Sequence, residues 1–178
     1  MKLFLELSPV RRANVWLDEA PAADFTPSFT VSETLEPRFA ATAVRRVAGV
    51  EINIDHGPRA SYGLLGAELV DAEVDGLEVV VSLNNVGFPL RPSLALQPDE
   101  VTIGLLEEYA PAVIAGVQRA IESGGVPSKA SLRFRWAAHG LVGSSPSIFE
   151  RIGAIVVRLL TMPKDVKEAD LRLLLERA

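Results

Sequence analysis

Two histidines are the side chains of this sequence best suited to acid–base chemistry or metal binding. His56 and His139 are the only histidines in the chain, and Asp55 precedes the first of them. A metal site would need further ligands, and the sequence offers no convincing third one. Cysteine is absent, which excludes thiolate ligands, disulfides and cysteine nucleophiles. We therefore expect no metal, and two exposed histidines in loops that lie close together.

Three arginines and one tyrosine have the chemistry that RNA contacts use. Arg59 and Tyr62 belong to a turn-like stretch, whereas Arg133 and Arg135 alternate with apolar residues in a strand-like stretch. A guanidinium group binds phosphate through forked hydrogen bonds, and an aromatic ring stacks on a base. In a second interpretation, Arg133 and Arg135 form the solvated face of an amphipathic strand. The sequence leaves both interpretations open.

A glycine–serine loop is the most specific enzymatic signal. Residues 140–145 read Gly-Leu-Val-Gly-Ser-Ser and precede a predicted helix that begins at Pro146. This loop resembles the phosphate loop of the galactokinase and homoserine kinase group, and N–H groups at a helix start bind phosphate. That group has a large second domain after the loop, and only a short stretch follows here. Pro146 also removes one N–H, so the alternative is a glycine turn with Ser145 as N-cap.

The composition predicts an ordinary globular protein of one domain. The chain has 178 residues, of which 48% are hydrophobic and 23% charged, enough for a core without staples. No apolar run approaches the about 20 residues of a membrane span, and the N-terminus lacks a signal-peptide pattern. We expect a cytoplasmic protein without membrane contact. The net charge of −5 argues against DNA or other nucleic-acid binding through bulk charge, but allows a local basic patch.

The spacing of apolar residues predicts the elements that must position these groups. Strand-like pieces at 3–7 and 14–17 predict an N-terminal arm or edge hairpin over residues 1–27. Period-two alternation predicts strands near residues 50–54, 65–69, 77–83 and 132–136, the first three joined as an antiparallel meander with a turn at Asp75-Gly76. Helical spacing predicts one helix over about 110–123, a second that starts at Ser145-Pro146 and a third over 166–175. Residues 84–99 are predicted to form a loop.

These elements predict an α/β (α+β) fold. We expect a two-layer sandwich in which two helices cover one face of a mainly antiparallel four-stranded sheet. The domain would span residues 28–162, between the N-terminal arm and a C-terminal helix within 163–178.

Four stretches in a fixed order carry a family resemblance. They are residues 31–35 (VSETL), 57–63 (GPRASYG), 108–124 (beginning EYAPAV and ending IESG) and 142–149 (VGSSPSIF). They are similar to V-x-Y-R-E-T-I, G-G-R-G-Q-Y-G, E-Y-I-P-A-V with A-M-x-S-G, and V-D-S-S-E-M-A-F. These are motifs of the fourth domain of translation elongation factor G and of related ribosomal-protection GTPases. Over about residues 28–160 the chain therefore resembles that domain.

The resemblance implies a left-handed crossover fold in which the tip loops 56–63 and 137–146 lie together. In the family this tip reaches the decoding region and touches tRNA and mRNA. The expected RNA- or ribosome-facing residues are Arg59, Tyr62, Arg133, Arg135, His139, Ser144 and Ser145.

The chain also departs from the family pattern. It has no G-x-x-x-x-G-K-[ST] motif and so no phosphate cradle for GTP. Pro58 and Ala60 replace glycines of the first tip loop, and the acidic residue before Ser144-Ser145 is missing. The 84–99 loop is an insertion relative to the family.

Three functional hypotheses follow. The first is a non-catalytic binding module related to the fourth domain of elongation factor G, with the ribosome or tRNA as partner. The second is a protein-interaction or self-association module, whose partner is a separately encoded protein or a second copy of the chain. The third is a small phosphate-binding enzyme that uses the Gly140–Ser145 loop. No complete catalytic constellation is present, so we expect neither an enzyme nor a cofactor.

Overall fold

The computed structural model describes residues 1–37, 46–124 and 126–177. The strands are β1 (Lys2–Ser8), β2 (Arg11–Leu17), β3 (Phe29–Leu35), β4 (Val47–Asp55), β5 (Ala60–Asp71), β6 (Leu77–Leu83), β7 (Val101–Ile103) and β8 (Ala130–Gly140). A short 3-10 helix, η1 (Glu107–Tyr109), leads into α1 (Ala110–Ser123). The other helices are α2 (Pro146–Thr161) and α3 (Glu168–Arg177).

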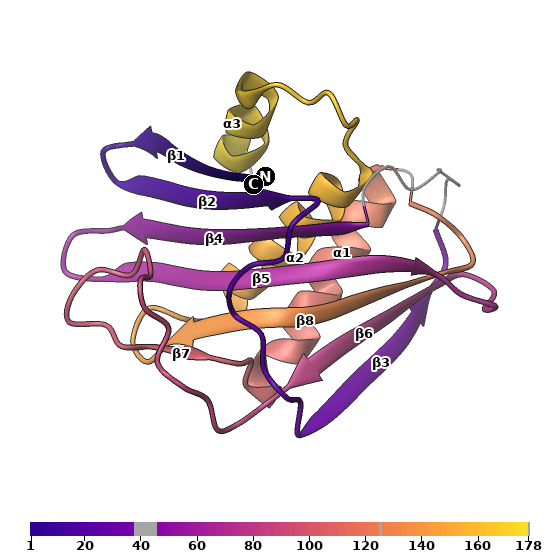
Figure 1. The fold of residues 1–178 in the computed structure, drawn as a ribbon, viewed down its shortest axis with the longest axis horizontal. Helices are drawn as coiled ribbons and strands as arrows, with labels where there is room; N and C mark the ends of the chain where they lie inside the picture. The colour runs from indigo at the N-terminus through magenta and orange to yellow at the C-terminus, as the bar shows by residue number, and fades with distance from the viewer. Residues whose placement is uncertain (38–45, 125, 178) are drawn as a thin grey trace.

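The described strands form one eight-stranded sheet with the order β1-β2-β4-β5-β8-β6-β3, in which β7 also pairs with β8 (Figure 1). The neighbouring strands are antiparallel except for β6 and β8, which are parallel. The predicted mixed α/β class with a mainly antiparallel sheet is confirmed. The sheet is larger than the four strands expected, because the β1–β2 hairpin continues it beyond β4 and β3 continues it beyond β6.

The predicted meander of three consecutive strands is wrong in its last step. β4 and β5 pair as expected, but β8 lies between β5 and β6. Gly76 has a φ of 99° and does form a turn. The turn is, however, hydrogen-bonded to Lys129, the residue just before β8. Ala72 N donates to Lys129 O at 3.0 Å, and Lys129 N donates to Gly76 O at 2.8 Å. A turn dipeptide predicts that the chain reverses, but it leaves open whether a later strand inserts between the two.

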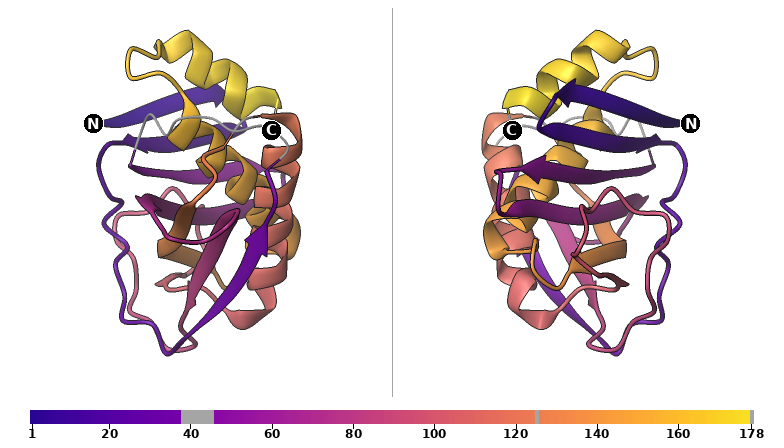
Figure 2. Two further views of the ribbon diagram at one scale, coloured as in Figure 1. Left: turned by 90° about the vertical axis from the view of Figure 1, so that its right-hand side faces the viewer. Right: turned by 90° about the vertical axis from the view of Figure 1, so that its left-hand side faces the viewer.

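Helices α1 and α2 cover one face of the sheet, as Figure 2 shows. Their apolar residues recur at helical spacing and are buried, as predicted from the sequence. Ser145 is the N-cap of α2, with its side chain accepting a bond from Ile148 N, and Pro146 takes the first helical position. The two helices cross very closely at Gly116, where a Cβ atom would lie 2.0 Å from the Glu150 carbonyl oxygen.

The segment between β6 and β7 lies over the opposite face of the sheet. A buried network of polar groups joins this segment to the sheet. Glu51 is buried and accepts hydrogen bonds from Tyr62 Oη at 2.9 Å and from Asn14 Nδ2 at 2.7 Å. The backbone N–H of Leu94, within the covering segment, also donates to Glu51 at 2.7 Å. The carboxylate therefore fastens this segment to the sheet. Asn53, also buried, has a side-chain amide without a hydrogen-bond partner among the described residues.

None of the helices in the described ranges combines the length and the apolar character that crossing a membrane requires.

Candidate nucleic-acid interface

The two predicted tip loops contact each other directly. Tyr62 N, at the start of β5 just after the β4–β5 turn, donates a hydrogen bond of 2.9 Å to Gly143 O in the loop between β8 and α2. The Ser144 hydroxyl donates to Tyr62 O at 2.8 Å and accepts from Gly140 N at 2.9 Å. Arg59 is exposed at this tip. The geometry therefore brings Arg59, Ser144 and Ser145 into one region of the surface.

The Gly140–Ser145 loop holds a carboxylate of the chain itself. The Asp99 side chain accepts hydrogen bonds from Val142 N and from Gly143 N, both at 2.9 Å. A Cβ atom at position 143 would lie 2.7 Å from Asp99 Oδ2, which explains the glycine. Two of the N–H groups that a bound phosphate would use are thus already engaged by Asp99, and the loop forms a turn before α2.

Tyr62 and His139 lie in the interior, contrary to the expectation that they face RNA. Tyr62 is 0% exposed, and its burial, together with Glu51, raises the pKa of its phenol. His139 is 5% exposed, with Nδ1 3.0 Å from Gly104 O and its ring near Tyr109. The reason is that β5 begins at Ala60 and β8 runs to Gly140, so both residues belong to strands and not to loops. Neither ring is available to stack on a base.

The two histidines do not form a metal site. His56 is exposed at the end of β4, whereas His139 is buried within β8. The described part of the chain contains no group of three or more histidine, cysteine, aspartate or glutamate side chains placed to hold an ion.

Arg133 and Arg135 are exposed on β8, away from the tip. Arg133 Nε donates to Ser131 Oγ at 3.2 Å. Arg135 forms an ion pair with Glu68 at 2.9 Å, and this hydrogen bond raises the pKa of its guanidinium. Gly140, at the tip end of the strand, follows Arg133 by seven residues, which is about 23 Å of strand. These two arginines therefore fit the alternative interpretation of a solvated strand face.

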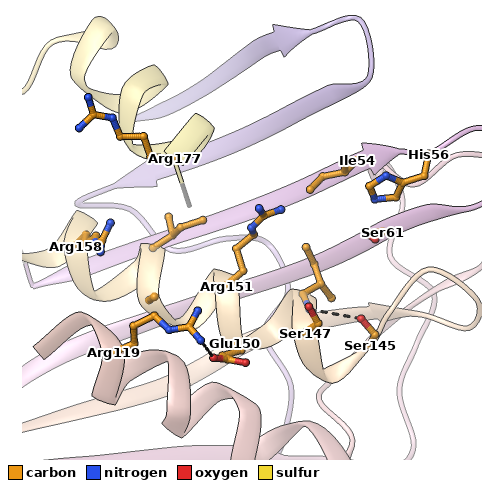
Figure 3. A pocket seen from close by; sticks show the side chains of 13 residues that line it. Ile54, His56, Ser61, Arg119, Ser145, Ser147, Glu150, Arg151, Arg158 and Arg177 are labelled. Atoms are coloured by element: carbon orange, nitrogen blue, oxygen red, sulfur yellow. Dashed lines mark hydrogen bonds and ion pairs between the residues drawn. The ribbon is translucent and has the colours of Figure 1, made fainter. Parts of the chain in front are cut away.

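A cleft of about 550 Å³ begins beside the tip and follows α2 (Figure 3). Its floor is apolar and includes Ile148, Ala154 and Ile155 of α2. The ends of β4 and β5, α1 and the end of α3 supply the rest of the lining. Its polar lining consists of His56, Ser61, Arg119, Ser145, Ser147, Glu150, Arg151, Arg158 and Arg177.

The charge of this arginine cleft is strongly positive. Its lining holds four arginines and one carboxylate, Glu150, which pairs with Arg119. Arg151 has no hydrogen-bond or ion-pair partner among the described residues, and Figure 3 shows it extending from α2 into the open middle of the cleft. Burial, and then the neighbouring positive charge of Arg11, lower the pKa of Arg151. A partly buried positive charge beside another one favours the binding of an anion.

The positive side chains in and beside the arginine cleft come from separate parts of the chain. Arg151 and Arg158 are seven residues apart on α2, so they lie on one face about 10.5 Å apart along the axis. Arg177 comes from α3, and Arg11 of β2 donates to the last carbonyls of α3, Leu175 O at 3.0 Å and Glu176 O at 3.1 Å. The sequence analysis missed this site. The seven-residue spacing on a predicted helix was the available signal, but the contributions of Arg11 and Arg177 depend on tertiary structure.

The tip and the arginine cleft form one continuous surface. His56 and Ser61 flank the tip turn 57–60, and Ser145 lies at the end of the second tip loop, as the N-cap of α2; all three line the cleft. From Ser145 to Arg158 the surface runs along α2 for about 20 Å. An elongated anionic ligand fits this arrangement better than a single small ion.

Comparison of the chain with models of known protein families and with curated proteins finds no match to either.

Proposed function

We propose that this protein is a non-catalytic RNA-binding module that holds phosphate groups of an RNA backbone in the arginine cleft. The observation that carries the proposal is Arg151, which lies partly buried beside Arg11 and without an anionic partner among the described residues. Arginine is well suited to phosphate because its planar fork donates two parallel hydrogen bonds. Phosphate contacts of this kind supply most of the affinity in sequence-independent nucleic-acid binding.

The cleft is organised in advance for such a ligand. The ion pair with Glu150 holds Arg119 at the side of the cleft, and Arg11 is held by the carbonyls at the end of α3. Less side-chain freedom is then lost on binding, which favours affinity. A phosphate between Arg151 and Arg158 would also relieve the repulsion that Arg151 experiences in the free protein.

The scaffold supports a relationship to the fourth domain of elongation factor G, with the ribosome or tRNA as partner. In Figure 1, β6 and β8 point to the left, α1 lies behind the sheet, and the chain steps upward from β6 to β8. This sense of connection is left-handed, whereas about 98% of such connections are right-handed. The resemblance predicts this rare hand, and it also predicts the contact between the two tip loops. Both features support the proposed relationship.

Co-sedimentation with ribosomal subunits and filter binding of tRNA, both at low salt, test the proposal. The wild-type protein should bind at least one of the two, and Arg151→Glu should abolish that binding, because it places a negative charge inside the cleft. Arg133→Glu is the matched control, since it makes the same charge change on an exposed strand position outside the cleft. Absence of binding to both ligands, or equal loss in both variants, would refute the proposal.

A further inference from the structure

We infer that the RNA held by the arginine cleft is helical, and that the cleft contacts the sugar–phosphate backbone of a base-paired strand. This inference rests on the proposed function and adds the structural class of the ligand.

The lining of the arginine cleft suits a backbone whose bases are hidden. Its polar side chains are arginines, serines and one glutamate, and His56 is the one residue with a ring. Proteins that recognise single-stranded RNA stack its unpaired bases on aromatic side chains. Helical RNA is instead recognised through phosphates, 2′-hydroxyl groups and shape. The chemistry of this cleft corresponds to the second mode.

The aromatic residues of the described chain lie elsewhere. Tyr62, Tyr109 and Phe149 are buried. The exposed rings of Phe4, Phe29 and Phe88 belong to β1, to β3 and to the segment after β6, and none of them lines the cleft. A single strand that entered the cleft would leave its bases without stacking partners there.

Two serine hydroxyls are placed to contact sugars. Ser61 and Ser147 line the tip end of the cleft, and neither hydroxyl has a hydrogen-bond partner among the described residues. A hydroxyl both donates and accepts, as does the ribose 2′-OH. Phosphates on arginines and 2′-hydroxyls on serines are the two contacts that a base-paired RNA strand offers along its backbone.

The spacing of two arginines along the rigid helix α2 also favours a helical RNA strand. Arg151 and Arg158 have a fixed separation of about 10.5 Å along α2. A helical strand presents its phosphates at fixed spacings, whereas a flexible strand must lose conformational freedom to match them.

Fluorescence anisotropy with three labelled probes of one sequence tests the inference. The probes are an RNA duplex of about 20 base pairs, its single strand, and the corresponding DNA duplex. We expect the RNA duplex to bind about tenfold more tightly than the single strand, and severalfold more tightly than the DNA duplex. The double variant S61A/S147A should reduce the preference for RNA duplex over DNA duplex and leave binding of the DNA duplex unchanged.

The outcomes separate this inference from the proposed function. If the single strand binds as tightly as the duplex, and Arg151→Glu abolishes both, the inference is overturned while the proposed function stands. Equal affinity for the RNA and DNA duplexes would also overturn it, because the cleft would then recognise charge alone. If no probe binds, or if Arg151→Glu binds like the wild type, the proposed function fails as well.

Discussion

Under the proposed function, Arg151 would contribute to RNA binding at the expense of stability. Its guanidinium is partly buried and is repelled by Arg11. Both effects make its positive charge unfavourable in the free protein. Residues of this kind persist at functional sites because the ligand compensates for them. Arg133, by contrast, is exposed and donates to Ser131, so it contributes little to stability in either direction.

Arg151→Gln should therefore raise thermal stability and weaken RNA binding together. The gain is about 0.5 kcal/mol, because solvent screens much of the repulsion, and it corresponds to about 1–2 °C in Tm for a domain of this size. Differential scanning fluorimetry and tRNA binding measure the two effects. Arg133→Gln should change neither. A lower Tm for Arg151→Gln with unchanged binding would show that Arg151 is a structural residue.

Tyr62 makes stability depend on alkaline pH. The pKa of its phenol is raised above the ordinary value of 10.0 by burial and by Glu51. The folded protein then keeps the proton at a pH where the unfolded chain has lost it. The stabilisation is complete below about pH 10 and is lost as the pH rises further, at up to about 1.4 kcal/mol per pH unit.

Tyr62→Phe should flatten this alkaline loss. At neutral pH the variant should be less stable by about 1–2 kcal/mol, because Glu51 loses one of its donors. Between about pH 10 and 11 the stability of the wild type should fall towards that of the variant. Urea unfolding at several pH values measures both effects. Parallel stability curves for the two proteins would contradict the buried Tyr62–Glu51 hydrogen bond.

At the residue scale, features that depend on neighbouring residues could be predicted from the sequence, whereas contacts between residues far apart in the sequence could not. Ser145 and Pro146 identify the start of α2 because capping depends on neighbouring residues. The family resemblance places Tyr62 and His139 in tip loops, yet backbone pairing with Asn53 and with Thr102 makes both positions part of strands. Arg11 and Arg151 are 140 positions apart in the sequence, so no local pattern could relate them.

At the scale of elements, the crossing of α1 and α2 positions the arginine cleft. Gly116 brings α1 against the backbone of α2 at Glu150, which immediately precedes Arg151. The crossing also places Arg119 of α1 beside Glu150. A change in the distance between the two helices would therefore move Arg119 relative to the α2 side of the cleft.

Gly116→Ala should destabilise the protein and disturb RNA binding together. Its Cβ would lie 2.0 Å from Glu150 O, so the helices must separate, at a cost of about 1–3 kcal/mol. Gly124→Ala is the matched control, since its nearest neighbour, Ala120 O, would be at an ordinary 3.6 Å. Urea unfolding and tRNA binding measure the two effects. Equal stability of the two variants would contradict the close crossing.

Alternation and helical spacing predicted six of the eight described strands and the three α-helices, because both patterns follow from which face of an element is buried; β3 and β7 were not predicted. The insertion of β8 between β5 and β6 was not predictable from the turn at Asp75-Gly76. Pairing of β8 with its two neighbours depends on residues 53 to 74 positions away, and the parallel pair also needs the α1 crossover.

At the scale of the whole molecule, the distribution of charge matters more than its sum. The chain carries a net charge of −5, yet four of its fourteen arginines line the arginine cleft together with a single carboxylate. The remaining surface repels a polyanion while the arginine cleft attracts it, which orients the ligand toward one side. Composition alone argued against nonspecific binding, and it could not reveal this asymmetry.

The salt dependence of tRNA affinity tests the central claim most directly. If Arg151, Arg158 and Arg177 neutralise three phosphates, the slope of log K against log salt should be about −2 to −3. Each arginine replaced by glutamine should then reduce that slope by about 0.7–0.9, so that the double variant R151Q/R158Q gives a slope of about −1. Arg133→Gln should leave the slope at the wild-type value. An unchanged slope in R151Q/R158Q would contradict the account, because the phosphates would then be bound elsewhere.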